Sequence, residues 1–148
     1  MTTTITTSDP LSPAFTLMAA GRIAWGTAAV LAPRTNLRVA GAPSLGAPHT
    51  DYLIGVFGAR ALAIGLGYVT GDAATRARWR RFGLLIDVVD TVNGLARLAA
   101  VDDAESRRAG RLMVAITGAY AIVGLTDAAT GIVRSRQTAR RARSALAA

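Results

Sequence analysis

Four long apolar runs alternate with short polar segments along this chain. Each run has about 20 mostly apolar residues, the length that an α-helix needs to cross the hydrocarbon core of a bilayer. Each is apolar around nearly its whole circumference, whereas a helix of a soluble bundle is apolar along one stripe. The pattern predicts an all-α protein, a four-transmembrane-helix bundle with spans at about residues 14–32, 52–70, 82–101 and 112–133. A soluble helical bundle with these runs as its core is a further interpretation.

Proline and glycine mark the ends of the runs. Pro33 stops the first run, because proline lacks the N–H that a continuing helix needs. Residues 36–50 contain two glycines and two prolines and are predicted to form a loop. Residues 71–81 are predicted to form a short hinge with four arginines, and residues 102–111 a link of mixed charge.

The basic residues, all of them arginine, orient the predicted spans. Residues 1–13 carry no arginine and are predicted to be a disordered lead, and residues 134–148 carry five arginines and are predicted to be a frayed helical extension or a disordered tail. With the hinge, these two segments hold nine arginines on one side of the spans, against five on the other. Because arginine is enriched in cytoplasmic segments, both termini are predicted to lie in the cytoplasm, with the chain multi-pass in a bacterial inner membrane.

Composition supports a membrane protein and excludes some chemistry. The chain of 148 residues has the length of one domain, and its hydrophobic content of 51% and mean hydropathy of +0.35 exceed those usual for a soluble domain. The absence of cysteine excludes disulfides, thiolate metal sites and a cysteine nucleophile. The formal net charge is +8, and the heavy use of alanine and arginine is typical of a GC-rich genome.

The third run is the most polar of the four. Asp87, Asp90, Gly94 and Arg97 follow each other at spacings of three or four, which places them on one helical stripe. A charge that faces lipid costs at least about 2.5 to 3.5 kcal/mol. This stripe is therefore predicted to face other helices and to be paired there.

The other runs carry charges that could complete the pairing. Arginine lies near the middle of the first two runs and aspartate in the fourth, which predicts one intramembrane polar network of Arg22, Arg60, Asp87, Asp90 and Asp127. Arg97 is predicted to reach the interface or to meet Asp51. Two interpretations stay open: the charges lock the bundle, or a carboxylate such as Asp90 lines a polar cavity that moves protons or holds a small polar ligand.

Small residues recur where helices would pack. In membranes, glycine lets helix backbones approach closely. The second run contains four glycines, and the fourth run has a small and polar stripe. The second run's glycines are Gly55, Gly58, Gly65 and Gly67, and the stripe is Thr117, Tyr120, Gly124, Asp127 and Gly131.

No motif indicates an enzyme. HExxH, a Walker-type glycine-rich loop and GxSxG are absent, and the single histidine, His49, lies in the predicted loop. We therefore expect a non-enzymatic protein with no catalytic residue, cofactor or metal site. A basic segment directly after a span is first of all attracted to anionic lipid, so the expected partners are the lipid bilayer and other membrane proteins or further copies of the chain, with no nucleic acid.

Three short segments carry a resemblance to known proteins. They are GRIAWGTAAVLAPR at residues 21–34, FGARALAIGLG at 57–67 and LLIDVVDTVNGL at 84–95. On these the chain resembles small four-helix integral membrane proteins of actinobacteria whose function is unknown, broadly similar to DoxX-like proteins. The resemblance implies a membrane role, linked in some relatives to redox or stress complexes, and it maps no catalytic residue.

Two functions are compatible with these patterns. The first is a structural or accessory subunit of an inner-membrane complex, which would use the small-residue faces and the basic segment 134–148 for contacts. The alternative is a small carrier or a proton-coupled transport component built around the predicted polar network.

Overall fold

The computed structural model describes residues 12–146, which form helices and no strand. The predicted all-α class is confirmed. The predicted lead at residues 1–13 lies almost wholly outside the described residues, and its last two residues begin the first helix. In chain order the elements are α1 (Ser12–Leu31), α2 (Pro33–Val39), the 3-10 turn η1 (Pro43–Leu45), α3 (Pro48–Thr70), α4 (Ala73–Leu98) and α5 (Ala104–Leu146).

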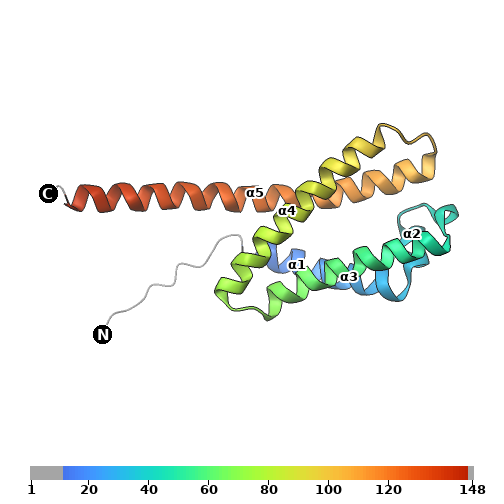
Figure 1. The fold of residues 1–148 in the computed structure, drawn as a ribbon, viewed down its shortest axis with the longest axis horizontal. Helices are drawn as coiled ribbons and strands as arrows, with labels where there is room; N and C mark the ends of the chain where they lie inside the picture. The colour runs from blue at the N-terminus through green and yellow to red at the C-terminus, as the bar shows by residue number, and fades with distance from the viewer. Residues whose placement is uncertain (1–11, 147–148) are drawn as a thin grey trace.

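The long helices form two hairpins (Figure 1). α1 packs along α3, and α4 packs along α5, while α3 and α4 join the hairpins. The start of α1, the turn between α3 and α4 and the C-terminal end of α5 lie toward one end of the molecule. The segment with α2 and η1 lies at the other end, with the turn between α4 and α5.

Glycines hold the first hairpin together. A Cβ atom added at Gly26 would lie 2.6 Å from the carbonyl oxygen of Gly58, and one added at Gly58 would lie 2.6 Å from the Cβ of Ala29. The backbones of α1 and α3 are therefore in direct contact, as small residues allow. Gly65 packs in the same way against α1, whereas Gly55 has nothing within 4 Å of the position that a Cβ would take.

The second hairpin follows the predicted stripe of α5 over most of its length. Thr117 and Gly124 are buried, and a Cβ added at Gly124 would lie 2.9 Å from Leu84 of α4. Thr91 of α4 donates a hydrogen bond to the hydroxyl of Thr117 at 2.9 Å. The stripe ends before Gly131, which is exposed and where an added Cβ would meet nothing within 4 Å.

Side-chain caps shorten the connections that the sequence predicted. The backbone N–H of Thr75 donates to the carboxylate of Asp72 at 2.7 Å, so α4 begins at Ala73 and the predicted hinge at residues 71–81 is wrong. In the same way Ser106 N–H donates to Asp103 at 2.7 Å, and α5 begins inside the predicted link. These backbone hydrogen bonds hold the pKa of each capping carboxyl below its usual value.

Pro33 ends one helix and opens the next. α1 stops at Leu31, as predicted, and Pro33 occupies the first turn of α2, where its missing N–H costs nothing. The predicted loop at residues 36–50 is accordingly shorter, because it holds the end of α2, the turn η1 and the start of α3.

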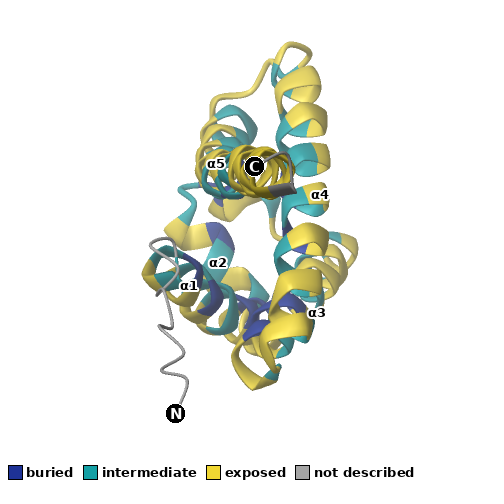
Figure 2. Cartoon of the chain, turned by 90° about the vertical axis from the view of Figure 1, so that its left-hand side faces the viewer, coloured by how far each residue is buried: buried dark blue, intermediate teal, exposed yellow. Residues whose placement is uncertain are grey.

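The basic C-terminal segment is a regular helix as far as residue 146. Of the two forms predicted for it, the structure has the helical extension, because α5 continues without a break for 43 residues, about 65 Å at 1.5 Å per residue. Residues 131–145 are all exposed, and this end of α5 projects beyond the hairpins (Figures 1 and 2).

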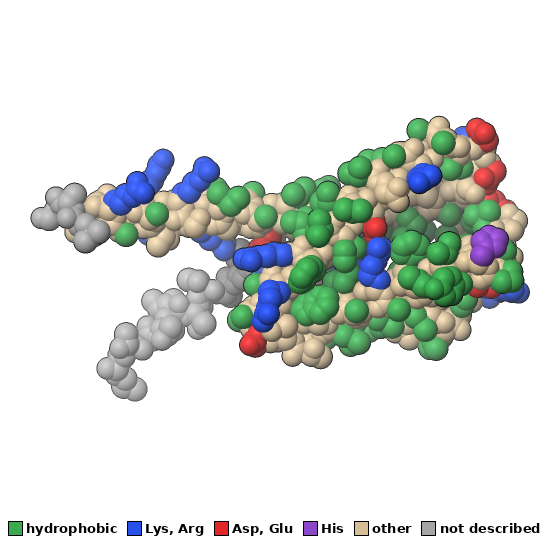
Figure 3. Space-filling view, in the orientation of Figure 1, with side chains coloured by type: hydrophobic (Ala, Val, Ile, Leu, Met, Phe, Trp, Pro, Cys, Tyr) green, Lys and Arg blue, Asp and Glu red, His purple; other side chains and the backbone are tan. Residues whose placement is uncertain are grey.

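Within residues 12–146, three helices are long and apolar enough to cross a membrane, namely α1, α3 and α5. α4 is not among them, because it carries the arginines after Asp72 and the aspartates of the third run. Large apolar side chains gather on the face of the hairpins seen in Figure 3, and Leu17, Leu31 and Ile122 are 75%, 78% and 66% exposed. An apolar surface of this extent favours a lipid neighbour over water.

Candidate functional site

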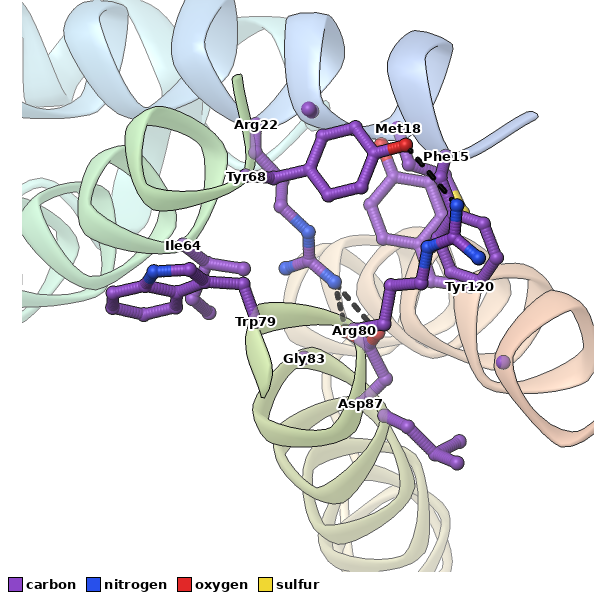
Figure 4. Close-up of a pocket in the computed structure, with 13 residues that line it drawn as sticks. Phe15, Met18, Arg22, Ile64, Tyr68, Trp79, Arg80, Gly83, Asp87 and Tyr120 are labelled. Atoms are coloured by element: carbon purple, nitrogen blue, oxygen red, sulfur yellow. Dashed lines mark hydrogen bonds and ion pairs between the residues drawn. The ribbon is translucent and has the colours of Figure 1, made fainter. Parts of the chain in front are cut away.

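An ion pair between Arg22 of α1 and Asp87 of α4 lies at the centre of the bundle (Figure 4). Nη2 of Arg22 donates to both carboxylate oxygens of Asp87, at 2.7 and 2.6 Å. The side chain of Asp87 is only 2% exposed and that of Arg22 11%. The Arg22 guanidinium also lies over the ring of Tyr120, 4.7 Å from its centroid. This pair thus joins α1, α4 and α5.

A second ion pair lies one helical turn further along α4. Nη2 of Arg60, on α3, donates to Oδ2 of Asp90, and the Arg60 guanidinium lies 4.9 Å from the centroid of the Phe57 ring. The side chains of Arg60 and Asp90 are 38% and 25% exposed. The second pair is therefore much more accessible than the first.

Asp127 lies apart from these four residues. It pairs with Arg80 of α4 at 3.6 Å, and Arg80 also lies over the ring of Phe15 at 4.3 Å. Asp127 is seven residues beyond Tyr120, and Arg80 is seven residues before Asp87. Because α4 and α5 are antiparallel, Asp127 and Arg80 are displaced in the same direction along the bundle. At 1.5 Å per residue, each lies about 10.5 Å from the level of Tyr120 and Asp87. Sequence reasoning missed Arg80 because it placed this arginine in a hinge.

Asp51, at the start of α3, pairs with a different arginine from the one that the sequence suggested. Nε of Arg34, in the first turn of α2, donates to Asp51 of α3 at 3.0 Å, so Asp51 pairs with Arg34 and not with Arg97. Arg97 lies exposed in the last turn of α4. His49 is exposed in the first turn of α3. Among the described residues, no group of three His, Cys, Asp or Glu side chains is placed to hold a metal ion.

A cavity of about 530 Å³ lies between the two hairpins. All four long helices line it, mostly with apolar and aromatic side chains, and both Arg–Asp pairs stand in its wall. Its charges cancel, because it holds two arginines and two aspartates. The lining includes Arg22, Trp25, Phe57, Arg60, Ile64, Ile86, Asp87, Asp90, Ile116, Thr117 and Tyr120.

A much smaller cavity of about 20 Å³ shares the first ion pair with the large one. Figure 4 shows its lining, in which Arg22 points toward Asp87 and Arg80 toward the hydroxyl of Tyr68. Its volume suits about one water molecule. The Arg22–Asp87 ion pair therefore separates the small cavity from the large one.

No family model, curated protein or solved structure matches this chain. The geometry of the site therefore carries the functional argument. The four charges are brought together as two separate pairs, one buried with both carboxylate oxygens occupied and one half-open to a cavity. The first arrangement suits a structural tie, and the second suits contact with a small molecule.

Some residues of the site carried only a weak sequence signal. Trp25 lines the large cavity, and the Arg22 guanidinium lies over the face of the Tyr120 ring. Phe57 lies one turn before Arg60, and this spacing is the signal that could have placed its ring beneath that guanidinium.

Proposed function

We propose that this chain is a four-span integral membrane protein of a bacterial inner membrane, with its N- and C-terminal segments in the cytoplasm. Chain connectivity supports a fourth span. α3 ends at one end of the bundle and α5 begins at the other, so α4 must cross the same thickness as the three apolar helices. Pairing of Asp87 and Asp90 with arginines lowers the cost of placing α4 in lipid.

The topology is tested by single cysteines, for which the cysteine-free chain is its own background. Cysteines at Ala47 and Ala104 should react with an impermeant label added outside the cell. Those at Ala74 and Ala145 should react only after the membrane is opened. Extraction of the chain by carbonate, or labelling of Ala74 from outside, contradicts the proposal.

Within that membrane we propose a non-enzymatic role as a structural or accessory subunit of a larger complex. The observation that carries this proposal is the exposed end of α5. Residues 134–146 extend the helix by about 20 Å at 1.5 Å per residue, and they carry five arginines. A helix that continues from a packed span is already nucleated, so it forms a stiff basic arm without packing of its own. Such an arm suits contact with anionic lipid and with an acidic partner surface.

Truncation of the arm tests the accessory role. A chain that stops after Val133 should insert and fold normally but lose a partner that copurifies in constant proportion with the full chain in mild detergent. Replacing the five arginines by lysine should keep the partner, whereas replacing them by glutamine should release it. A full-length chain that purifies without any constant partner contradicts the accessory role.

The half-open ion pair favours a second candidate function, a small carrier or proton-coupled transport component. The observation is the cavity of about 530 Å³ with Arg60 and Asp90 in its wall. Purified protein in liposomes should then carry a proton flux that depends on substrate and is lost in Asp90→Asn. An Asp90→Asn variant that supports every phenotype of the parent removes this candidate.

A further inference from the structure

The large cavity lies at the mid-depth of the helices that line it. Trp25, Arg60 and Asp90 each lie well away from the ends of α1, α3 and α4. Phe57 and Ile116, which also line the cavity, are 42% and 38% exposed, so the cavity opens on the side of the bundle. With the bilayer placement proposed above, on which this inference rests, that opening faces hydrocarbon. An occupant then enters from the lipid and must dissolve in it.

The walls suit a hydrocarbon chain. Aromatic rings of Trp25, Phe57 and Tyr120 come from three different helices, and aliphatic side chains fill most of the remaining lining. The volume of about 530 Å³ falls within the range of about 300 to 1,000 Å³ that is usual for small-molecule sites. Apolar walls with a few polar groups at one place are typical of a site that orients an amphipathic ligand.

The accessible ion pair defines the polar group of that ligand. Among the described residues, Arg60 donates one side-chain hydrogen bond, to Oδ2 of Asp90, and Oδ1 of Asp90 accepts none. The pair therefore still offers donors and an acceptor. A hydroxyl group matches both, because it accepts a hydrogen bond from Arg60 and donates one to Asp90.

The charge balance of the cavity selects against a charged ligand. Its two arginines and two aspartates already cancel, so a charged headgroup would remain as an uncompensated charge in an apolar environment. The Arg22–Asp87 pair cannot rearrange easily to compensate, because both of its carboxylate oxygens are bonded and it is buried.

From these observations we propose that the cavity between the hairpins binds an uncharged amphipathic lipid, whose hydroxyl headgroup bonds to Arg60 and Asp90 and whose chain lies against Trp25, Phe57 and Tyr120. The Arg22–Asp87 pair forms the rigid back of the site. Arg60 and Asp90 form its polar contact.

Tryptophan fluorescence can test this site directly. The chain has two tryptophans, Trp25 in the large cavity and Trp79 outside it. A Trp79→Phe variant in phospholipid nanodiscs leaves Trp25 as the reporter, and Trp25→Phe gives the matched control. The probe is a long-chain alcohol with a dibrominated chain, which quenches a tryptophan that it contacts.

We expect saturable quenching of Trp25 that the unbrominated alcohol reverses and that the alkyl sulfate or alkyl trimethylammonium of equal length does not. Quenching that rises without saturation, that is equal for the Trp79 reporter, or that charged chains reverse equally well overturns the proposal. Ala119→Phe, which fills the cavity, should weaken the apparent affinity by about tenfold. Ala129→Phe, exposed on the same helix and outside the cavity, should not change it.

Brominated phospholipid alone separates this inference from the bilayer placement. Quenching of Trp25 by that lipid, with no saturable effect of the alcohol, refutes the ligand site and leaves the placement intact. No quenching by the brominated lipid refutes the placement and the site together.

Discussion

Arg22 and Asp87 lie 65 residues apart in the chain, yet one nitrogen of Arg22 donates to both carboxylate oxygens of Asp87, at 2.7 and 2.6 Å. Asp87 is the largest fully buried side chain among the described residues. The pair connects α1 of the first hairpin to α4 of the second. Its structural role is therefore tested by measuring the free energy of unfolding.

Removal of one partner of this pair should destabilise the bundle strongly. Asp87→Leu leaves the Arg22 guanidinium buried without its carboxylate, and breaking a buried pair in this way costs about 3 to 5 kcal/mol. The double variant Arg22→Met with Asp87→Leu should recover much of that loss, because no unpaired charge remains. Unfolding by increasing mole fractions of a denaturing detergent measures both.

Asp90→Leu provides the comparison for that experiment. Arg60 is more accessible than the buried Arg22, so after the loss of Asp90 its long side chain is free to turn toward the membrane interface, and the cost should be smaller than for Asp87→Leu. Equal losses for the two single variants would show that burial does not distinguish the two pairs.

The glycines of α3 should differ sharply in their tolerance of a methyl group. At Gly58 a Cβ would lie 2.6 Å from Ala29, so Gly58→Ala forces α1 and α3 apart and should cost about 1 to 3 kcal/mol. Gly55→Ala, three residues earlier in the same helix, meets nothing within 4 Å and should be neutral or slightly stabilising. Thermal unfolding in detergent, followed by circular dichroism, compares them, and similar midpoints would contradict the close contact of the hairpin.

The start of α4 should depend on pH through Asp72. The hydrogen bond from the Thr75 N–H holds the pKa of Asp72 below its usual value, so the ionised carboxylate stabilises the helix start. This contribution is complete above the usual pKa of aspartate and is lost as the pH falls through the lowered pKa. Hydrogen exchange at the Thr75 amide should therefore lose protection in acid. Asp72→Asn keeps a capping side chain without a titratable group, and its Thr75 amide should lose that pH dependence.

The basic end of α5 should contribute nothing to the stability of the hairpins. Residues 131–145 are exposed, so truncation after Val133 removes no packed side chain. The unfolding midpoint in detergent should stay unchanged, while binding to vesicles that contain anionic lipid should weaken and become less sensitive to salt. A lower midpoint would show that the arm folds back onto the bundle.

The sequence by itself determined the helical class, the approximate positions of the long helices and four of the charges that the structure pairs. An unpaired charge within a run of some 20 apolar residues costs free energy whichever helix it packs against. Sequence alone could therefore identify Arg22, Arg60, Asp87 and Asp90 before their partners were known. The end of α1 before Pro33 could also be predicted from sequence, because the missing N–H of proline affects only the helix that contains it.

Only the tertiary structure decided which charge meets which, because pairing depends on the depth at which helices pass each other. The antiparallel register of α4 and α5 moves Asp127 to Arg80 and away from Arg22. The same is true of the glycines: Gly55 and Gly58 are alike in sequence, and the face that α1 covers makes one a contact and leaves the other open. The cavity lies between two hairpins that meet through α3 and α4, through α1 and α5 and between η1 and α5, and no stretch of sequence encodes such a space locally.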